Sequence, residues 1–405
     1  MKKCLICGAS IEEFMSFGKM PIANGFLSPG QFKDEYFFEL KTAFCQNCGM
    51  FQLLEQPLKE MMFNENYAFF SGTSKRMALH FKEFADEVLD KYIKAKDPFV
   101  VEIGSNDGIL LQNFSAKNIR HLGIEPSANV AQAASAKGIN TVSEFFDEKL
   151  ARKVCQEHGQ ADVILAANCM CHIPYLHSVV EGMKLLLKPG GRVIFEDPYL
   201  ADVLEKTSYD QIYDEHVFLF SLASVKYLFN EHSMELADVK PQETHGGSMR
   251  YYIAHKGTHS PGKSVQEQLK KEGDLGLSEP ETFEAFRRNC ERSKKELISV
   301  LNDIKREGKR VVGYAATSKS TTVINYCGIG PDLIEFICDT TPIKQGKFSP
   351  GKHIPIKPYE EFVKSYPEYA LLFGWNHAKE IMAKEEDFAS QGGKWIVYVP
   401  KVGIN

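Results

Sequence analysis

The sequence lacks the features that mark membrane, secreted and nucleic-acid-binding proteins. No apolar run approaches the roughly 18 residues that a membrane-spanning helix needs. The first residues, MKKCLICGASIEEF, contain no apolar signal-peptide core before their acidic pair. Positive charge is not in excess, because 48 lysines and arginines face 53 aspartates and glutamates. We therefore expect a cytoplasmic protein that has neither a membrane nor a nucleic acid as a partner.

What the chain does have is the size and composition of a multidomain globular protein. Its 405 residues fit two or three domains. The composition, 43% hydrophobic and 25% charged, supports packed cores and argues against disorder. Ten cysteines without an export signal indicate reduced thiols or metal ligands, not disulfides.

Four of the cysteines form two CxxCG pairs near the start of the chain, Cys4 with Cys7 and Cys45 with Cys48. Four thiolates from two such tight turns suit tetrahedral Zn²⁺ and leave no open position for catalysis, which indicates a structural zinc site. The stretch between the pairs must then hold a small sheet or hairpins. A nucleic-acid-binding zinc ribbon is the alternative, and the sparse lysine and arginine in this region disfavour it.

The segment PFVVEIGSNDGILLQ predicts a buried parallel strand that turns tightly into a helix. Glu125 follows at the end of the next apolar segment, HLGIE, where an acid can accept hydrogen bonds from ribose hydroxyls. The loop lacks the third glycine of G-x-G-x-x-G, so it suits S-adenosylmethionine (SAM) better than a dinucleotide or a ligand-free structural turn. Aromatic residues after the third strand offer packing for an adenine ring. The candidate cofactor-binding residues are Glu102, Gly104, Asn106, Asp107, Gly108, Glu125, Glu144, Phe145, Phe146 and Asn168.

Strand-like and helix-like segments alternate through most of the chain, which predicts an α/β protein with parallel sheets. We expect a central doubly wound, Rossmann-like domain, closed by an edge hairpin at MELADVK and SMRYYIAH, and a smaller Rossmann-like domain at the C-terminus. A helix is expected after VVEIG, another over HSVVEGMKLLLKPGG, and one long helix from ETFEAF to KREG. The predicted divisions are a zinc-binding domain over 1–57, the SAM domain over 58–257, a helical linker over 258–306 and the C-terminal domain over 307–405.

Catalytic candidates lie where ligands bind in open α/β sheets, beyond the carboxyl ends of the strands. His172 follows the strand ADVILAA, and a long excursion after GRVIFEDP contains Tyr213, Asp214, Glu215 and His216. A histidine can act as a general base near neutral pH, a neighbouring carboxylate can orient it, and a phenol can donate to an oxyanion. The alternative is an exposed polar turn that precedes a core helix.

Several motifs in order make the whole chain resemble the SAM-dependent nucleotide-sugar C-methyltransferases, which add a branching methyl to a 4-keto deoxysugar. The motifs are the two CxxCG pairs with ANGFL between them, SGTS, EIGSNDG, GIEP, ANCMCHI, IYDEHVFLFSL, HGGSMR and DTTPIKQGKFSPGKHIPI. The chain departs from the family pattern at Asp214, often a histidine, at Phe69, often a tyrosine, and in the loop GYAATSKSTT, which lacks two glycines. Lys319 of that loop is either a phosphate ligand or a surface lysine.

The resemblance implies roles for the candidates. His216 is expected to remove the proton beside the ketone, with Tyr213 and Glu215 as its supporting partners and His172 in the same site. The implied reaction is SAM-dependent methylation of the carbon next to the ketone, C-3, of a nucleotide-linked 4-keto-6-deoxyhexose or a related keto-sugar through an enolate. The C-terminal domain is expected to help hold the nucleotide. The alternatives are an O-methyltransferase acting on a nucleotide sugar or polysaccharide precursor, and a zinc-ribbon interaction protein with a vestigial SAM fold. The oligomeric state, monomer or otherwise, stays open.

Overall fold

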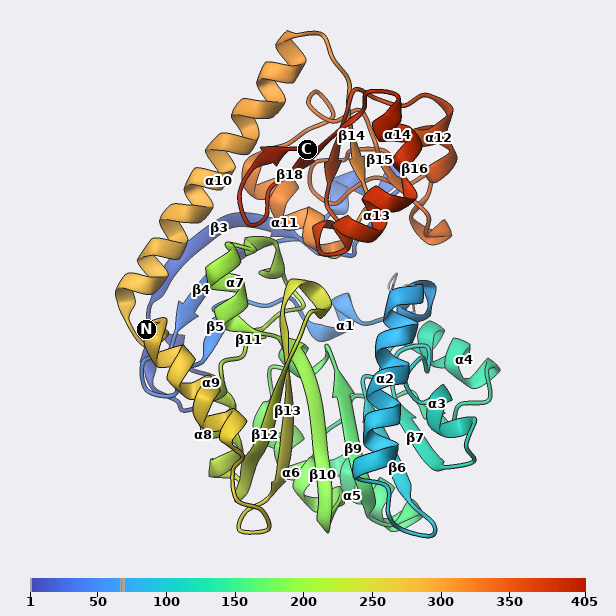
Figure 1. Cartoon of the computed structure of the whole chain (residues 1–405), viewed down its shortest axis with the longest axis vertical. Helices are drawn as coiled ribbons and strands as arrows, with labels where there is room; N and C mark the ends of the chain where they lie inside the picture. Colours follow the sequence, from blue (N-terminus) through green and yellow to red (C-terminus); the bar gives the residue numbers. More distant parts are fainter. Residues whose placement is uncertain (1, 66, 68–69) are drawn as a thin grey trace.

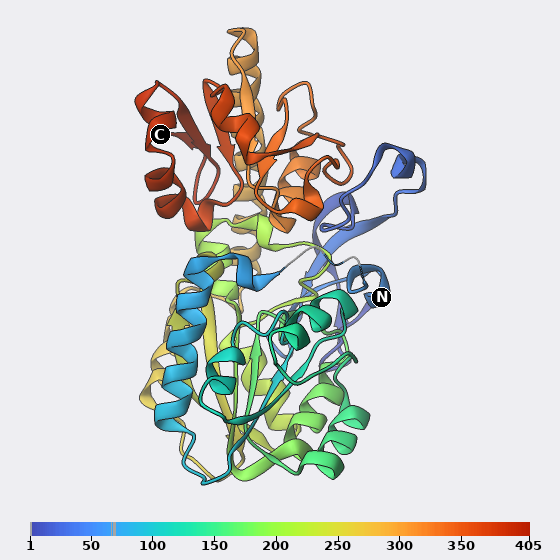
Figure 2. The same ribbon diagram turned by 90° about the vertical axis from the view of Figure 1, so that its right-hand side faces the viewer.

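The computed structural model describes residues 2–65, 67 and 70–405, which contain three larger β-sheets and one two-stranded ribbon, with helices around two of the larger sheets (Figure 1). The central sheet lies in the lower part of Figure 1, the C-terminal sheet above it, and the N-terminal strands run along one side of both. The turned view in Figure 2 shows the same division into an upper and a lower lobe. Among the described residues no helix is long and apolar enough to span a membrane.

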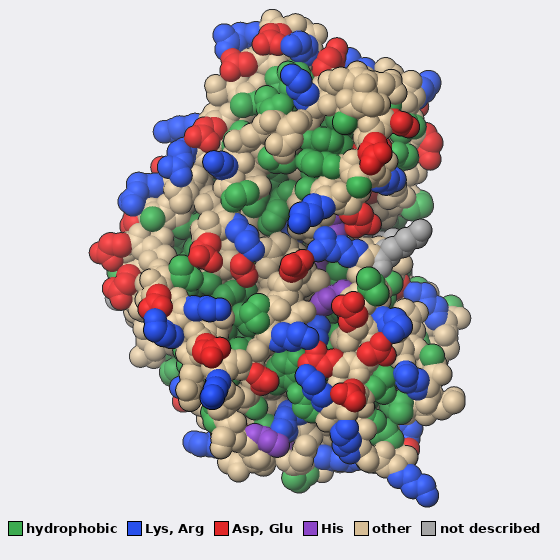
Figure 3. All heavy atoms as spheres, in the orientation of Figure 1, with side chains coloured by type: hydrophobic (Ala, Val, Ile, Leu, Met, Phe, Trp, Pro, Cys, Tyr) green, Lys and Arg blue, Asp and Glu red, His purple; other side chains and the backbone are tan. Residues whose placement is uncertain are grey.

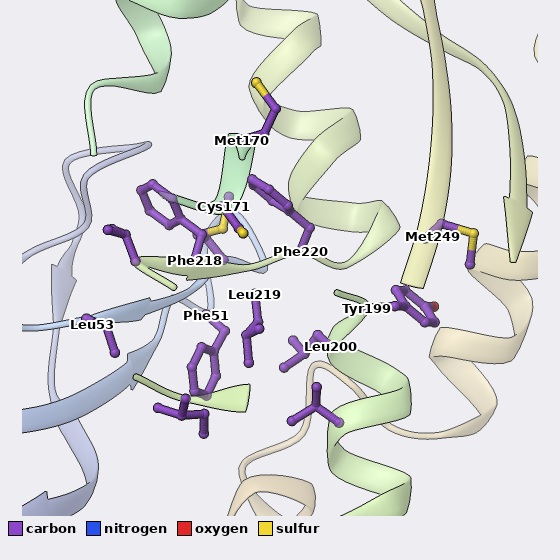
Figure 4. Close-up of a cluster of buried hydrophobic side chains, with 14 of the residues drawn as sticks. Phe51, Leu53, Met170, Cys171, Tyr199, Leu200, Phe218, Leu219, Phe220 and Met249 are labelled. Carbon is purple, nitrogen blue, oxygen red and sulfur yellow. The ribbon is translucent and has the colours of Figure 1, made fainter. Parts of the chain in front are cut away.

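The N-terminal sheet is small and antiparallel, as expected for the stretch between the cysteine pairs. It has the strand order β11-β5-β4-β3, and a separate ribbon pairs β1 with β2. The bounds are β1 (Lys2–Lys3), β2 (Ser10–Ile11), β3 (Glu13–Pro21), β4 (Phe37–Phe44), β5 (Phe51–Leu53) and β11 (Phe218–Leu219). Strand β11 comes from the excursion that carries the catalytic candidates. Figure 4 shows Phe218 and Leu219 of β11 among the same buried side chains as Phe51 and Leu53 of β5.

The central sheet is doubly wound, with the order β12-β13-β10-β9-β6-β7-β8. The pairings from β10 to β8 are parallel, and the predicted antiparallel hairpin closes the edge beside β10. The bounds are β6 (Phe99–Ile103), β7 (Arg120–Ile124), β8 (Thr141–Val142), β9 (Ala161–Ala167), β10 (Leu187–Pro198), β12 (Met234–Gln242) and β13 (Ser248–His255).

Helices cover both faces of this sheet because successive strand residues point to opposite sides. On β6, Val100 packs in one core cluster with α2, whereas Val101 packs in another with α5, α6 and α8. The helices are α1 (Lys59–Met62), α2 (Lys75–Lys91), α3 (Gln112–Ser115), α4 (Ala128–Ala136), α5 (Glu148–His158), α6 (Leu176–Leu186), α7 (Leu200–Lys206) and α8 (Leu222–Glu231).

Two expected helices are shorter in the structure than the sequence suggested. Only the single turn of α3 follows β6, because residues 106–111 form turns. Helix α6 ends at Leu186 and does not run through KPGG, since Pro189 cannot continue a helix and favours an extended residue before it. The strand β10 begins directly afterwards.

The C-terminal sheet has the order β16-β15-β14-β17-β18-β19, and it is parallel except for β19. Its elements are β14 (Val311–Tyr314), α11 (Ser318–Cys327), β15 (Ile337–Asp339), β16 (Ile356–Pro358), α12 (Tyr359–Lys364), β17 (Tyr369–Leu372), α13 (Ala378–Lys384), α14 (Glu386–Ser390), β18 (Lys394–Val397) and β19 (Gly403–Ile404). The predicted long helix is α10 (Pro280–Arg306), which rises along the side of the upper lobe in Figure 1.

The segment predicted as a linker is firmly attached to the central part of the chain. Helix α9 (Lys263–Asp274) carries the buried Glu272, which accepts hydrogen bonds from the Leu222 and Ala223 amides and from the Tyr199 hydroxyl. These bonds hold α9 against the start of α8. The predicted domain boundaries themselves remain predictions.

Candidate active site

One cavity collects side chains from the carboxyl ends of the central strands, from the excursion at 199–221 and from the start of α11. Parallel strands of one sheet end at the same edge, so residues far apart in sequence meet there. Histidine side chains are visible on the face shown in Figure 3, at the level where the lobes meet. The cavity therefore lies between the central doubly wound sheet and the C-terminal domain.

The cofactor side of the cavity is built around the turn after β6. Gly104 has φ +68°, and a Cβ there would lie 2.6 Å from Cβ of Cys169, so only glycine fits. Glu125 lies at the end of β7, and its carboxylate accepts the amides of Asn106 at 3.1 Å and Ser127 at 2.8 Å. Burial raises the pKa values of Glu125 and Glu102, and Oε2 of Glu102 is buried without a hydrogen-bond partner in the described structure. The glycine turn leaves its backbone accessible to a ligand, and the buried carboxylates can still accept hydrogen bonds. Both features suit the ribose and amino groups of SAM.

Most of the predicted cofactor-binding residues line the cavity. Phe145 and Phe146 form part of its wall, as does Asn168, a left-handed residue (φ 54°) whose Oδ1 has no partner in the described structure. Phe145 also lies 4.1 Å, measured at the ring centroid, from Nζ of Lys59. These side chains surround the same space as Glu102, Gly104, Asn106 and Glu125.

Three predicted residues lie outside the cavity wall. Asp107 binds the Gly72 amide at 3.2 Å and Lys137 Nζ at 2.8 Å, which ties the turn to the segment before α2. Gly108 packs closely, because a Cβ there would lie 2.8 Å from Cγ1 of Ile139. Glu144 is exposed and pairs with Lys153 at 3.3 Å. Their predicted cofactor contacts remain predictions, and the structure offers Asp107 and Gly108 a supporting role.

The Tyr213–His216 segment is buried, so the alternative of an exposed polar turn is wrong. The exposed fractions of Asp214, Glu215 and His216 are 1%, 2% and 5%. Nδ1 of His216 lies 2.6 Å from the Gln211 carbonyl oxygen, which can only accept, so Nδ1 carries the proton and Nε2 is free to take one. Burial, with the nearby His172, holds the pKa of His216 well below its usual value, so the ring is neutral.

Glu215 is held by groups from two other parts of the chain. Asn24 Nδ2 donates to Oε1 at 2.6 Å, and the Tyr67 hydroxyl donates to Oε2 at 3.1 Å. Burial raises the pKa of Glu215 to about 7, although both hydrogen bonds oppose that rise. Tyr67 thus supplies a phenol to the site. The family departure at Phe69 lies outside the described residues.

His172 and Tyr213 flank His216. The ring centroids of His172 and His216 are 5.3 Å apart, and those of Tyr213 and His216 are 4.2 Å apart. Burial lowers the pKa of His172 to about 4, and its Nε2 is buried with no partner in the part of the chain described. The structure therefore brings all four predicted catalytic residues into one cavity, while their catalytic roles stay predictions.

Two lysines of the C-terminal domain complete the far wall. Lys319, only 8% exposed, donates to the His245 carbonyl at 3.2 Å, and Lys344 donates to the Ala316 carbonyl at 2.9 Å. The surface-lysine alternative for Lys319 is thus wrong. Burial lowers the pKa of Lys319 to about 8, and no ion pair of either lysine occurs among the described residues. Two buried cations on one wall favour an anionic ligand.

Sequence reasoning missed Asn24 and Lys344 as site residues because they lie far from the catalytic segment in the chain. Both belong to motifs that carried the resemblance, ANGFL and PIKQGK, and that was the available signal. Asn24 also accepts a hydrogen bond from Ser318 Oγ at 3.0 Å, so it touches the start of α11 as well as Glu215.

The four cysteines of the CxxCG pairs converge as predicted. Sγ atoms lie 3.6 Å apart for Cys4 and Cys48 and 3.4 Å apart for Cys7 and Cys45, and all four lie within 4.8 Å of one another. Sulfurs around tetrahedral zinc are about 3.8 Å apart, given Zn–S bonds of about 2.3 Å. The four sulfurs fit a closed, structural zinc site.

The fold and the cavity define a SAM-dependent methyltransferase, and three family profiles agree with this. Residues 4–63 match a zinc binding domain, 75–237 a methyltransferase domain, and 243–400 a C-methyltransferase C-terminal domain. The chain is also 32% identical over 404 residues to C-methyltransferase NovU of Streptomyces niveus, covering 98% of this chain and 96% of that protein. The chain belongs to this family of zinc-binding C-methyltransferases, and the vestigial-fold alternative is wrong.

More distant proteins share only part of the chain. A ubiquinone biosynthesis O-methyltransferase of Acinetobacter baylyi is 27% identical over 99 residues, which are 24% of this chain and 42% of that protein. The structure of magnesium protoporphyrin IX methyltransferase from Synechocystis PCC 6803 with bound SAM aligns with a TM-score of 0.34 at 13% identity, covering 46% of this chain and 84% of that one. These likenesses are too weak to bear on the substrate.

Proposed function

We propose that the chain methylates the carbon next to the ketone, C-3, of a nucleotide-linked 4-keto-6-deoxyhexose or a related keto-sugar. The observation that carries this is the neutral, buried His216, whose Nδ1–H is fixed on a carbonyl beside the cofactor wall. A sugar carbon becomes a nucleophile only after a base removes its proton, and the hydrogen bond that keeps the His216 proton on Nδ1 supports that role for Nε2.

The residues of the chain divide the reaction between them. His216 Nε2 takes the proton beside the ketone, and the C–H electron pair moves to the carbonyl oxygen to give an enolate. Tyr213 lies beside His216 and can donate a hydrogen bond to the enolate oxygen. SAM held at the cofactor side of the cavity would supply an electrophilic methyl group to the carbanion, with S-adenosylhomocysteine leaving as the sulfur–methyl bond breaks. The His216 proton then passes to solvent.

The far wall supports a nucleotide diphosphate as the substrate handle. Lys319 and Lys344 present two buried cations that donate to carbonyl oxygens, and each also lies over an aromatic ring, Trp375 at 5.8 Å for Lys319 and Phe26 at 5.1 Å for Lys344. A diphosphate would meet this unpaired charge with charge-assisted hydrogen bonds. The small-molecule substrate of the family is thus proposed to be a nucleotide sugar.

An O-methyltransferase could use His216 on a hydroxyl, so the experiment must distinguish carbon from oxygen. The protein is incubated in D₂O without SAM with dTDP-, GDP- and CDP-linked 4-keto-6-deoxyhexoses, and deuterium at C-3 is followed by NMR. We expect exchange with one substrate, and a C-methylated product once SAM is added. An O-methylated product without exchange would overturn the proposal.

A further inference from the structure

A second group of metal-ligand side chains lies at the cavity wall, apart from the four-cysteine site: His172 and His216 line the cavity, and Cys171 is buried beside them. Ligand atoms of Cys171, His172 and His216 all lie within 4.8 Å of one another. The first two come from the 3₁₀ turn at Met170–His172 and the third from the segment before β11. Two elements of the fold thus bring one sulfur and two imidazoles together.

The two imidazoles are in the form that binds metals. His216 donates Nδ1–H to the Gln211 carbonyl, which is the outer-shell bond that usually fixes a metal-binding histidine and turns its other nitrogen to the ion. Nε2 of His172 is buried and makes no hydrogen bond in the described structure, so this nitrogen has an unused position.

The third group decides which ions fit. Cys171 is fully buried, and its thiol is hydrogen-bonded to Asp197, a buried carboxyl whose Oδ2 has no partner in the structure described. A thiolate with two imidazoles selects Zn²⁺, Co²⁺ or Cu²⁺ over Mg²⁺ and Ca²⁺.

We propose that Cys171, His172 and His216 form a second metal site, which takes a borderline divalent cation such as Zn²⁺ with its open position toward the cavity. Binding forms one metal–sulfur and two metal–nitrogen bonds, and the Cys171 thiol proton passes to solvent. Three protein ligands with an open fourth position match an accessible zinc site, unlike the closed four-cysteine site.

Metal in this site silences the proposed reaction, because the Nε2 lone pair that would take the sugar proton is bound to the cation. This consequence rests on the proposed function, whereas metal binding does not. The site thus makes the enzyme sensitive to free zinc.

The test is a Co²⁺ titration of the full chain with zinc retained at the four cysteines, followed by absorption spectroscopy and metal analysis. We expect one Co²⁺ per chain, with visible bands of low coordination number and near-ultraviolet thiolate-to-cobalt charge transfer, and displacement by Zn²⁺. Cys171→Ala should lose the charge-transfer bands. If the burial of Cys171 prevents this variant from folding, His172→Ala is used in its place and should lose the bound Co²⁺. Cys155→Ser, a half-buried thiol on α5 outside the cavity, should bind like the parent protein.

Failure to bind Co²⁺ beyond the four-cysteine site, or charge transfer that survives in Cys171→Ala, would overturn the site. Saturating Zn²⁺ should lower methyl transfer by about 100-fold or more, which is the loss expected without a general base. If Co²⁺ binds with the predicted spectrum but turnover is undiminished, the metal site is confirmed and His216 is not the base. The spectrum therefore tests the metal site separately from the proposed function.

Discussion

At the scale of single residues, the proposed chemistry depends on which nitrogen of one buried histidine is free. The Gln211 carbonyl fixes the proton on Nδ1 of His216, and burial keeps the ring neutral. Neither property belongs to histidine itself, since an exposed imidazole is partly protonated near neutral pH and exchanges tautomers. The surroundings give His216 the tautomer and the neutral form that the proposed base requires.

Removal of this base should stop the reaction without loss of the cofactor. We expect His216→Ala to lower kcat by about 10²–10⁴-fold, because a general base contributes that much, and to abolish deuterium exchange at C-3. The affinity for S-adenosylhomocysteine, measured by calorimetry, should be unchanged. His158→Ala, an exposed histidine at the end of α5, is the matched control. Appreciable exchange by His216→Ala would assign the base elsewhere.

The charge of Lys319 should appear in the pH dependence of substrate capture. Burial lowers the pKa of this lysine to about 8, so the free enzyme loses a cation as the pH rises through 8. We expect kcat/KM for the nucleotide sugar to fall above pH 8, by up to about tenfold per pH unit, while kcat falls less because the bound diphosphate keeps the ammonium charged.

The matched variant is Lys319→Arg, since a guanidinium stays protonated throughout this range. It should retain binding at pH 9 and lack the alkaline fall in kcat/KM. The same fall in both proteins would show that another group titrates.

At the scale of elements, the turn after β6 and the end of β7 form the cofactor wall. Their sequence signals were local, because β-branched residues, glycines with positive φ and a terminal acid lie within one βα unit. Helices with amphipathic patterns, such as α2, α5 and α10, were predictable for the same reason. The short length of α3 and the early end of α6 were not predictable in this way. Turns after β6 and a proline after α6 override the apolar pattern of the longer segment.

Glu125 should bind the ribose hydroxyls, and its loss should weaken SAM. We expect Glu125→Ala to raise the dissociation constant of S-adenosylhomocysteine by about tenfold or more, given the strength of hydrogen bonds to a charged acceptor. Glu144→Ala serves as the control, because Glu144 is exposed and pairs with Lys153 outside the cavity wall. Calorimetry measures both. An equal loss of affinity in the two variants would show that Glu144 contacts the cofactor, as the sequence predicted.

At the scale of the whole molecule, the N-terminal segment joins the three sheets at the active site. The Ala23 amide donates to Asp214 Oδ1, and the Ala23 carbonyl accepts from Thr321 of α11. The neighbouring Asn24 bridges Glu215 and Ser318. The departure from the family at Asp214 thus has a structural use, since its carboxyl holds the N-terminal segment.

Asn24 should therefore affect turnover from outside the methyltransferase fold. We expect Asn24→Ala to lower kcat by about tenfold, because Glu215 loses a hydrogen bond made to a charged acceptor, with the SAM affinity retained. Steady-state kinetics and calorimetry separate the two effects. Asn302→Ala on the exposed side of α10 is the control. An unchanged kcat would show that Tyr67 alone positions Glu215.

The zinc site should stabilise the catalytic segment as well as its own sheet. His216 immediately precedes Val217, whose carbonyl accepts the Leu53 amide at 2.9 Å, and β11 pairs with β5. We expect Cys4→Ser to lose zinc, lower the melting temperature and lose methyl transfer together, since metal binding supplies folding free energy. Metal analysis and calorimetric melting test this, with Cys155→Ser as the control. A zinc-free protein with full activity would show that the zinc site does not stabilise the catalytic segment.

The sequence by itself determined the zinc ligands, the doubly wound fold, the cofactor turn and the positions of the catalytic candidates. These features depend on short spacings, such as CxxCG, and on periodic burial within one element. Both can be recognised in the local sequence. Only the tertiary structure decided that the YDEH segment is buried, that Asn24 binds it, that two lysines line the same cavity, and that Glu144 lies outside the cavity wall. Burial and proton position arise from contacts between distant segments, such as Asn24 and Glu215, which are 191 residues apart, and no local pattern contains them.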